Sequence, residues 1–233
     1  MKLFSSMLMI ALLSGMCSPT FSQTFKEGKI SYAVSVVEGD NIEAVDPKQK
    51  ASLPTTSDVY YKGKRSRSEM KSSEGTTIEI TDYAAGKTTV LIDSKGKKMS
   101  REIIFSDMNS DKREVREIKA TGEMKMIAGY NCERKILHCY IESADRFMEY
   151  EVWVTNQLML PVTPELSFDG IKGFALEYDV VKDGINLHMK ATKVESVPVS
   201  DSKFTIPAGY SPMAPPAPVD IPVGEIKILE PVK

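Results

Sequence analysis

Cys132, His138 and Cys139 lie within one stretch, AGYNCERKILHCYI (128–141). Thiolate and imidazole groups are the ligands that zinc prefers in proteins, so this stretch is the first candidate for a metal site. Two cysteines seven positions apart are also a candidate disulfide. The whole chain has three cysteines and two histidines, so few other residues offer this chemistry.

The predicted backbone of this stretch argues against both kinds of site. After Asn131, no glycine, proline, asparagine or aspartate interrupts it, which predicts a β-strand. At about 3.3 Å per residue, the two cysteines are about 23 Å apart and point to opposite faces. A disulfide needs Cα atoms within about 7 Å. His138 shares a face with Cys132 but lies roughly 20 Å away, beyond the reach of a shared metal ion.

Other arrangements of these residues stay open. A sharp bend at residues 133–135 would bring the cysteines together, and a cysteine could pair between two molecules. His188 could approach His138 from a neighbouring strand, but two histidines alone make a weak metal site. We therefore expect no bound metal and no cofactor.

Catalytic signatures are absent from the sequence. It contains no G-x-S-x-G elbow, no phosphate-binding glycine loop and no H-E-x-x-H pair. We predict a protein without catalytic residues, not an enzyme. Trp153, the sole tryptophan, shares a strand face with Glu149 and Glu151. That pattern predicts a partly covered surface aromatic; the alternative is a residue at the rim of a binding site.

The charge balance excludes one class of partner. The chain has 30 basic and 32 acidic residues, so it lacks the basic excess of a nucleic-acid-binding protein. Its basic cluster, KGKRSRSEMK (62–71), alternates Lys62 and Lys64 with Arg65 and Arg67. This alternation predicts a solvated strand face, with a polyanion or membrane surface as the alternative partner.

The first 22 residues have the pattern of a secretory signal peptide. Lys2 precedes an apolar run from Met7 to Met16, and small residues lead up to an expected cleavage between Ser22 and Gln23. The run is too short to span a bilayer, and no later segment is longer, so we expect no transmembrane segment. Acylation of Cys17 is the alternative, but the bulky Met16 before it disfavours a lipoprotein signal. The predicted location is the periplasm, the cell envelope or the outside of the cell.

Period-two alternation of apolar and polar residues recurs along the chain, as in strands with one buried face. It is clearest in 29–39, 76–104, 147–154 and 173–197. The second of these divides into three strands at Ala85-Gly86 and Lys95-Gly96, and the last is a hairpin around Asp183-Gly184. The fold class is mainly β: a single antiparallel domain over 23–210 that forms a curved sheet or half-barrel with little helix.

The remaining segments have weaker patterns. Any helix is expected in 40–55 or 155–170, although 46–56 and 105–112 have the composition of loops. Residues 211–233 hold six of the 13 prolines and predict an extended C-terminal tail. Its alternating Val219, Ile221 and Val223 leave open an edge strand laid on the domain.

Several blocks together resemble a family of exported bacterial proteins known as a domain of unknown function (four-four-one-two), which is similar to the GLPGLI group. The most specific are Ile127-Ala128-Gly129-Tyr130-x-Cys132 and Val199-x-Asp201-x-x-Phe204-x-Ile206-Pro207-x-Gly209-Tyr210. The resemblance covers roughly 120–210. Ala175 follows Gly173-Phe174 where the family often has proline. The resemblance implies the architecture of the LolA/LolB lipoprotein carriers, a half-open barrel whose concave side takes acyl chains.

A curved sheet with an apolar inner face either fills that face with side chains or leaves room for an apolar ligand. The residues expected to line such a site are Tyr32, Val34, Met148, Tyr150, Leu176, Tyr178 and Met189. Flexible methionine and amphipathic tyrosine suit an adaptable pocket. The expected partner is therefore a lipid or a lipid-modified protein. The alternative is a structural module of the envelope with a filled core, which binds another envelope protein through its tail or an edge strand.

Overall fold

The computed structural model describes residues 23–37, 46–105, 113–141, 145–159, 171–182 and 185–213. The predicted signal peptide (1–22), the predicted turn Asp183-Gly184 and the part of the predicted tail after Met213 lie outside the described residues. Most of the second region predicted to hold a helix, 155–170, and of the predicted loop 105–112 lie outside them as well.

Most of the described chain forms β-strands, as the alternation predicts. In chain order they are β1 (Gln23–Thr24), β2 (Glu27–Val36), β3 (Thr56–Lys62), β4 (Arg65–Ser72), β5 (Gly75–Asp82), β6 (Lys87–Ser94), β7 (Lys97–Ile104), β8 (Arg113–Ile127), β9 (Tyr130–Ile141), β10 (Arg146–Thr155), β11 (Leu158–Met159), β12 (Phe174–Lys182), β13 (Ile185–Glu195) and β14 (Ser211–Pro212). The mainly β, antiparallel fold class is confirmed.

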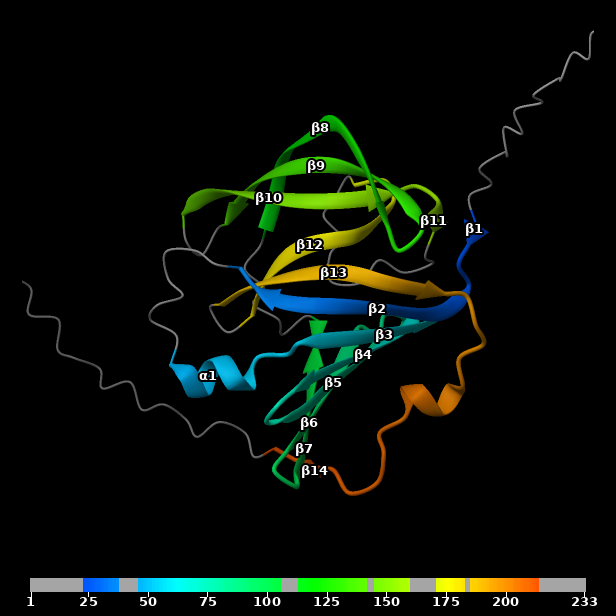
Figure 1. Ribbon diagram of the computed structural model, residues 1–233. Coiled ribbons are helices and arrows are strands. Elements are labelled where there is room, and N and C mark those ends of the chain that lie inside the picture. Colours follow the sequence, from blue (N-terminus) through cyan, green and yellow to red (C-terminus); the bar gives the residue numbers. More distant parts are fainter. Residues whose placement is uncertain are drawn as a thin grey trace, which may run out of the picture.

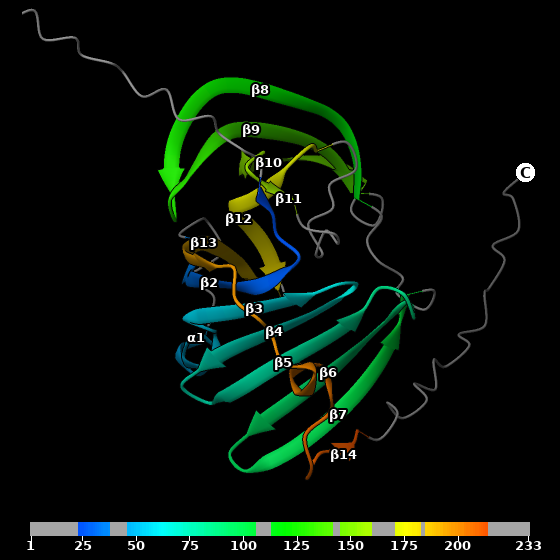
Figure 2. The same ribbon diagram turned by 90° about the vertical axis from the view of Figure 1, so that its right-hand side faces the viewer.

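Twelve of these strands form one sheet in the order β14-β7-β6-β5-β4-β3-β2-β13-β12-β10-β9-β8 (Figure 1). Each strand from β2 to β7 is antiparallel to the next, and so is each neighbouring pair from β8 back through β13 to β2. The sheet would close into a barrel if its two end strands, β14 and β8, paired, but they lie at opposite ends of a curved sheet (Figure 2). The sheet is therefore an unclosed barrel.

The predicted three strands in 76–104 are β5, β6 and β7, and tight turns join them. Lys95 and Gly96, between β6 and β7, have φ values of 51° and 82°. Two successive residues with positive φ match the twist of an antiparallel hairpin. Ala128 and Gly129 form a turn of the same kind between β8 and β9, with φ values of 49° and 89°.

A short helix, α1 (Pro47–Ser52), lies in one of the two regions where the sequence predicts a helix. The interpretation of 46–56 as a loop is wrong for these residues. Proline at the first helical position is pre-organised for a helix, and the Asp46 carbonyl accepts a hydrogen bond from the amide of Lys50 at 2.9 Å. Six residues give too little periodicity to be recognised. Among the described helices, none has the length and apolar composition needed to cross a membrane.

Different segments of the chain pack on the two faces of the sheet. We call the side under α1 the α1 face; it carries Ile30, Tyr32 and Val34 of β2, and Leu53, just after α1, packs against the same core cluster. We call residues 199–212 the strap. They cross the opposite side of β4 to β7 in the view of Figure 2, and we call that side the strap face.

Candidate functional site

The stretch that holds Cys132 and Cys139 is strand β9, as predicted. Cys132 and Cys139 form no disulfide with each other, and neither has any exposed surface. Burial raises the pKa of Cys132 to about 11, although Lys125 nearby opposes that effect. A thiol with so high a pKa stays protonated and is a poor nucleophile. His138 lies 3.1 Å from a carboxylate oxygen of Glu149 on β10. In the part of the chain that the structure describes, no three potential metal ligands come together.

Five of the seven residues predicted to contact a ligand are buried in the core, and Met148 and Tyr178 are partly buried against it. The strand register aligns Val34 with Met189, Met189 with Tyr178 and Tyr178 with Val152, so these side chains share one face. The other predicted residues lie two or four positions away along the same strands and so point to the same face. Together the side chains belong to two neighbouring core clusters. Tyr32 and Tyr178 meet edge to face, with ring centroids 5.9 Å apart. That these residues contact a ligand stays a prediction.

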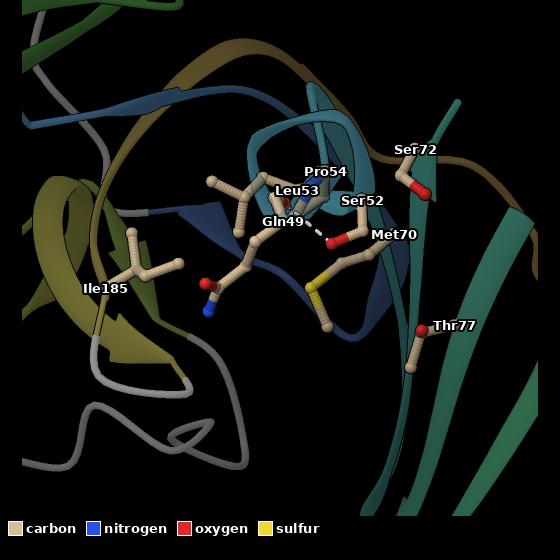
Figure 3. A pocket seen from close by; sticks show the side chains of 8 residues that line it. All are labelled: Gln49, Ser52, Leu53, Pro54, Met70, Ser72, Thr77 and Ile185. Atoms are coloured by element: carbon tan, nitrogen blue, oxygen red, sulfur yellow. Dashed lines mark hydrogen bonds between the residues drawn. The ribbon is translucent and has the colours of Figure 1, made fainter. Parts of the chain in front are cut away.

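A hollow of about 140 Å³ opens on the α1 face between α1 and the sheet (Figure 3). Its lining residues come from α1, the segment after it, β4, β5 and the start of β13: Gln49, Ser52, Leu53, Pro54, Met70, Ser72, Thr77 and Ile185. In this view the Gln49 side chain extends toward Ile185, and the Met70 thioether lies between Gln49 and Thr77 (Figure 3). None of the eight side chains carries a charge.

The register connects this hollow with the predicted ligand-contacting residues. Thr77 is aligned with Met70, Met70 with Ser57 and Ser57 with Tyr32. The hollow and the apolar core are therefore parts of one continuous face. Its volume is below the range of about 300–1,000 Å³ typical of a complete ligand pocket.

Comparisons with known proteins give little beyond this geometry. No family model matches the chain, and no curated protein is similar to it. Among solved structures, the crystal structure of LprF from Mycobacterium bovis is similar over 75% of this chain and 88% of that one, at 12% sequence identity and a TM-score of 0.34. A likeness that weak supports no argument about function. Membership of the exported family named above stays a prediction.

The basic cluster 62–71 does not face solvent as predicted, because the strap covers much of it. Asp201 of the strap accepts hydrogen bonds from Arg65 at 2.6 Å and from Lys62 at 3.2 Å. Arg67 is only 6% exposed; it donates to the Lys203 carbonyl at 2.8 Å and to Glu69 at 2.7 Å. The alternation of charged residues in 62–71 is typical of a solvent-exposed strand face. Nothing in this local pattern indicates that a distant segment neutralises these charges.

The strap also buries apolar groups on the strap face. Phe204 and Tyr210 pack against the cluster of Ile78, Ile80 and Leu91. At its far end, β14 pairs in parallel with β7, so the first residues of the predicted tail lie along that edge of the sheet. Hydrogen bonds, charge and apolar packing thus all hold this segment on the strap face.

A charged group surrounds Trp153, which is buried and not at the surface as predicted. Lys125 of β8 lies 3.8 Å from the centre of its ring and 2.7 Å from a carboxylate oxygen of Glu177 on β12. The indole nitrogen donates to Glu151 at 2.9 Å. Lys125 reaches Glu177 past two intervening strands, so the β8–β9 hairpin must bend over this side of the sheet.

His188 belongs to the same group rather than to a metal site with His138. Its two ring nitrogens lie 2.6 Å from Asp179 and 3.4 Å from Glu177. Lys190 lies 3.3 Å from the second oxygen of Glu177. These contacts hold the buried carboxylate of Glu177 between two lysines and beside a histidine.

Two of these carboxylates predict acid sensitivity. Burial alone would raise the pKa of Glu69, but hydrogen bonds from Lys203 and Arg67 outweigh it and hold the pKa below its ordinary 4.5. Burial alone would also raise the pKa of Glu177, but Lys125 and Lys190 outweigh it and lower that pKa. A lowered folded-state pKa gives stability that is fully present above pH 4.5 and is lost as pH falls through the folded value.

We therefore expect the melting temperature to fall with pH below 4.5. The melting temperature of Glu69→Gln should fall less steeply than that of the wild type. The reason is that the substitution removes one of the carboxylates that become protonated in acid. Thermal melts of both proteins between pH 3 and pH 7 provide the measurement. Parallel curves would mean that Glu69 does not contribute to the acid transition. Glu114→Gln, at an exposed position, is the control and should follow the wild type.

Proposed function

We propose that this protein binds a lipid or another apolar ligand on the α1 face and performs no catalysis. One observation carries the proposal: an apolar face that extends across β2, β13, β12 and β10 reaches an uncharged hollow under α1. An apolar chain gains about 0.8 kcal/mol for each buried methylene, so such a face is a favourable site for one.

In this proposal α1 moves to admit the ligand. The hollow is too small for a whole lipid, so the chain needs further space on the α1 face. The described side chains of α1, those of Gln49, Lys50, Ala51 and Ser52, are all exposed, so these four contribute little apolar burial that would hold the helix in place. Leu53 packs against the core, and the Ser73 hydroxyl donates to the Ala51 carbonyl. Displacement of α1 therefore costs little compared with opening the sheet.

The expected site of action is the cell envelope, after cleavage between Ser22 and Gln23. The basis is the pattern of residues 1–22, which precede the described chain. The partner in this proposal is a lipid or a lipid-modified protein that the sheet domain carries without altering it.

Mass spectrometry of the native protein from its own envelope, before and after organic extraction, tests the proposal. We expect a bound lipid at stoichiometric level, and uptake of a fluorescent fatty alcohol by the extracted protein. A bare mass without uptake would contradict lipid binding. Capture of an envelope protein in that case would favour the structural alternative.

A disulfide across the Ser73–Ala51 contact tests the movement of α1. The double variant Ala51→Cys, Ser73→Cys should take up the fatty alcohol when reduced and lose most of that uptake when oxidised. Ser73→Cys alone is the control, since it cannot lock the helix. Equal uptake in both redox states would contradict the movement of α1 and leave lipid binding itself intact.

A further inference from the structure

The hollow under α1 has polar groups but no charge, which limits what it can hold. Its polar members are the Gln49 amide and the hydroxyls of Ser52, Ser72 and Thr77. Its apolar members are Leu53, Pro54, Met70 and Ile185. Burying an ionised carboxylate or phosphate without a cation costs several kcal/mol, whereas a neutral hydroxyl needs only a hydrogen-bond partner.

Some of these polar groups have hydrogen-bonding capacity to spare. The Ser52 hydroxyl donates to the Gln49 carbonyl at 2.7 Å, and the Ser72 hydroxyl lies 3.4 Å from the Gly75 carbonyl. Within the described residues, the Gln49 amide and the Thr77 hydroxyl make no such bond. An amide offers two donors and an acceptor, and a hydroxyl offers one donor and two acceptor sites. Both groups can therefore donate to and accept from a neutral ligand.

The nearby cations do not alter this conclusion. Lys50 of α1 and Lys71 of β4 are exposed and are absent from the lining. Lys71 alternates with Met70 and Ser72 along β4, so its side chain leaves the sheet on the opposite face. Among the described side chains that line the hollow, a carboxylate would therefore find no cation.

We propose that the hollow selects a ligand with an uncharged, hydroxyl-bearing end, such as a monoacylglycerol, over a free fatty acid of the same chain length. This inference rests on the proposed function, because the acyl chain extends along the α1 face. Gln49 and Thr77 bind the hydroxyl groups, and Met70 and Ile185 contact the first carbons of the chain.

Competition titrations at pH 8, where a fatty acid is ionised, test this preference. Monooleoylglycerol and oleate each displace the fluorescent fatty alcohol from the extracted full-length protein. We expect monooleoylglycerol to bind at least about tenfold more tightly, a difference of about 1.4 kcal/mol. Equal affinity, or tighter binding of oleate, would overturn this inference and leave lipid binding intact. Failure of all three to bind would instead overturn the proposed function.

A charge introduced into the hollow should reverse the preference. Thr77→Lys places a cation there, so we expect oleate affinity to rise about tenfold relative to monooleoylglycerol. Thr77→Val, which removes only the hydroxyl, should weaken monooleoylglycerol several-fold and leave oleate unchanged. Thr76→Lys is the matched control, since Thr76 points to the other face of β5 and should alter neither ligand. An unchanged ratio in both Thr77 variants would place the ligand's polar end elsewhere.

Discussion

Arg67→Ala is expected to lower the free energy of unfolding by about 3 kcal/mol, the size typical of removing one partner from a buried ion pair. Arg67 lies beneath the strap, where its guanidinium bonds both Glu69 and the Lys203 carbonyl. Its loss leaves that carbonyl without its donor, and Glu69 keeps its contact with Lys203. This loss acts on the folded state.

Urea denaturation, together with limited proteolysis of the strap, measures this effect. Cleavage within 199–212 should become faster in Arg67→Ala, because the segment loses an attachment in the middle of the sheet. Arg65→Ala is the control: its partner Asp201 is largely exposed, so we expect a loss of no more than about 1 kcal/mol. Equal stability of Arg67→Ala and the wild type would mean that apolar packing alone retains the strap.

Leu176→Ala is the second substitution with a large expected effect, a loss of about 2–5 kcal/mol. Leu176 has no exposed surface and belongs to the largest core cluster, to which β2, β12 and β13 all contribute. Its truncation leaves a cavity between strands that the ladder hydrogen bonds hold in register, so the surroundings cannot collapse to fill it.

Met126→Ala provides the comparison for this substitution. Met126 is 61% exposed on β8, so its truncation should change the free energy of unfolding by less than about 0.5 kcal/mol. Chemical denaturation of both variants decides the matter. A loss below about 1 kcal/mol for Leu176→Ala would show that this part of the α1 face is loosely packed, which would itself favour a site that opens.

The local part of the fold is predictable from sequence because β-hairpins carry their own signals. Lys95-Gly96 defines a turn, and the alternation from Ile185 to Ala191 indicates which side chains of β13 are buried. Strand geometry alone separates Cys132 from Cys139 along β9, and the structure has no disulfide between them.

Contacts between distant segments are not predictable in the same way. The pairing of Asp201 with Lys62 and Arg65 joins residues more than 130 positions apart, and no periodicity records it. Trp153 has the alternation of a surface residue, yet the bent β8–β9 hairpin brings Lys125 over its ring. The hollow was missed for a related reason: α1 supplies part of it, and only the fold brings that helix against Thr77.

The consecutive strands β7 and β8 do not pair with each other, so the sheet consists of two halves, β2–β7 and β8–β13. This division affects the order in which the chain folds. Within β2–β7 and within β8–β13, most ladders join strands that are close in sequence, so their loops close at low entropic cost. The β2–β13 ladder is different, since it aligns Val36 with Leu187 and Lys29 with Glu195. Non-local pairing of this kind slows folding. The union of the two halves along β2 and β13 is therefore expected to be the slow kinetic step, and it is also the step that completes the apolar face.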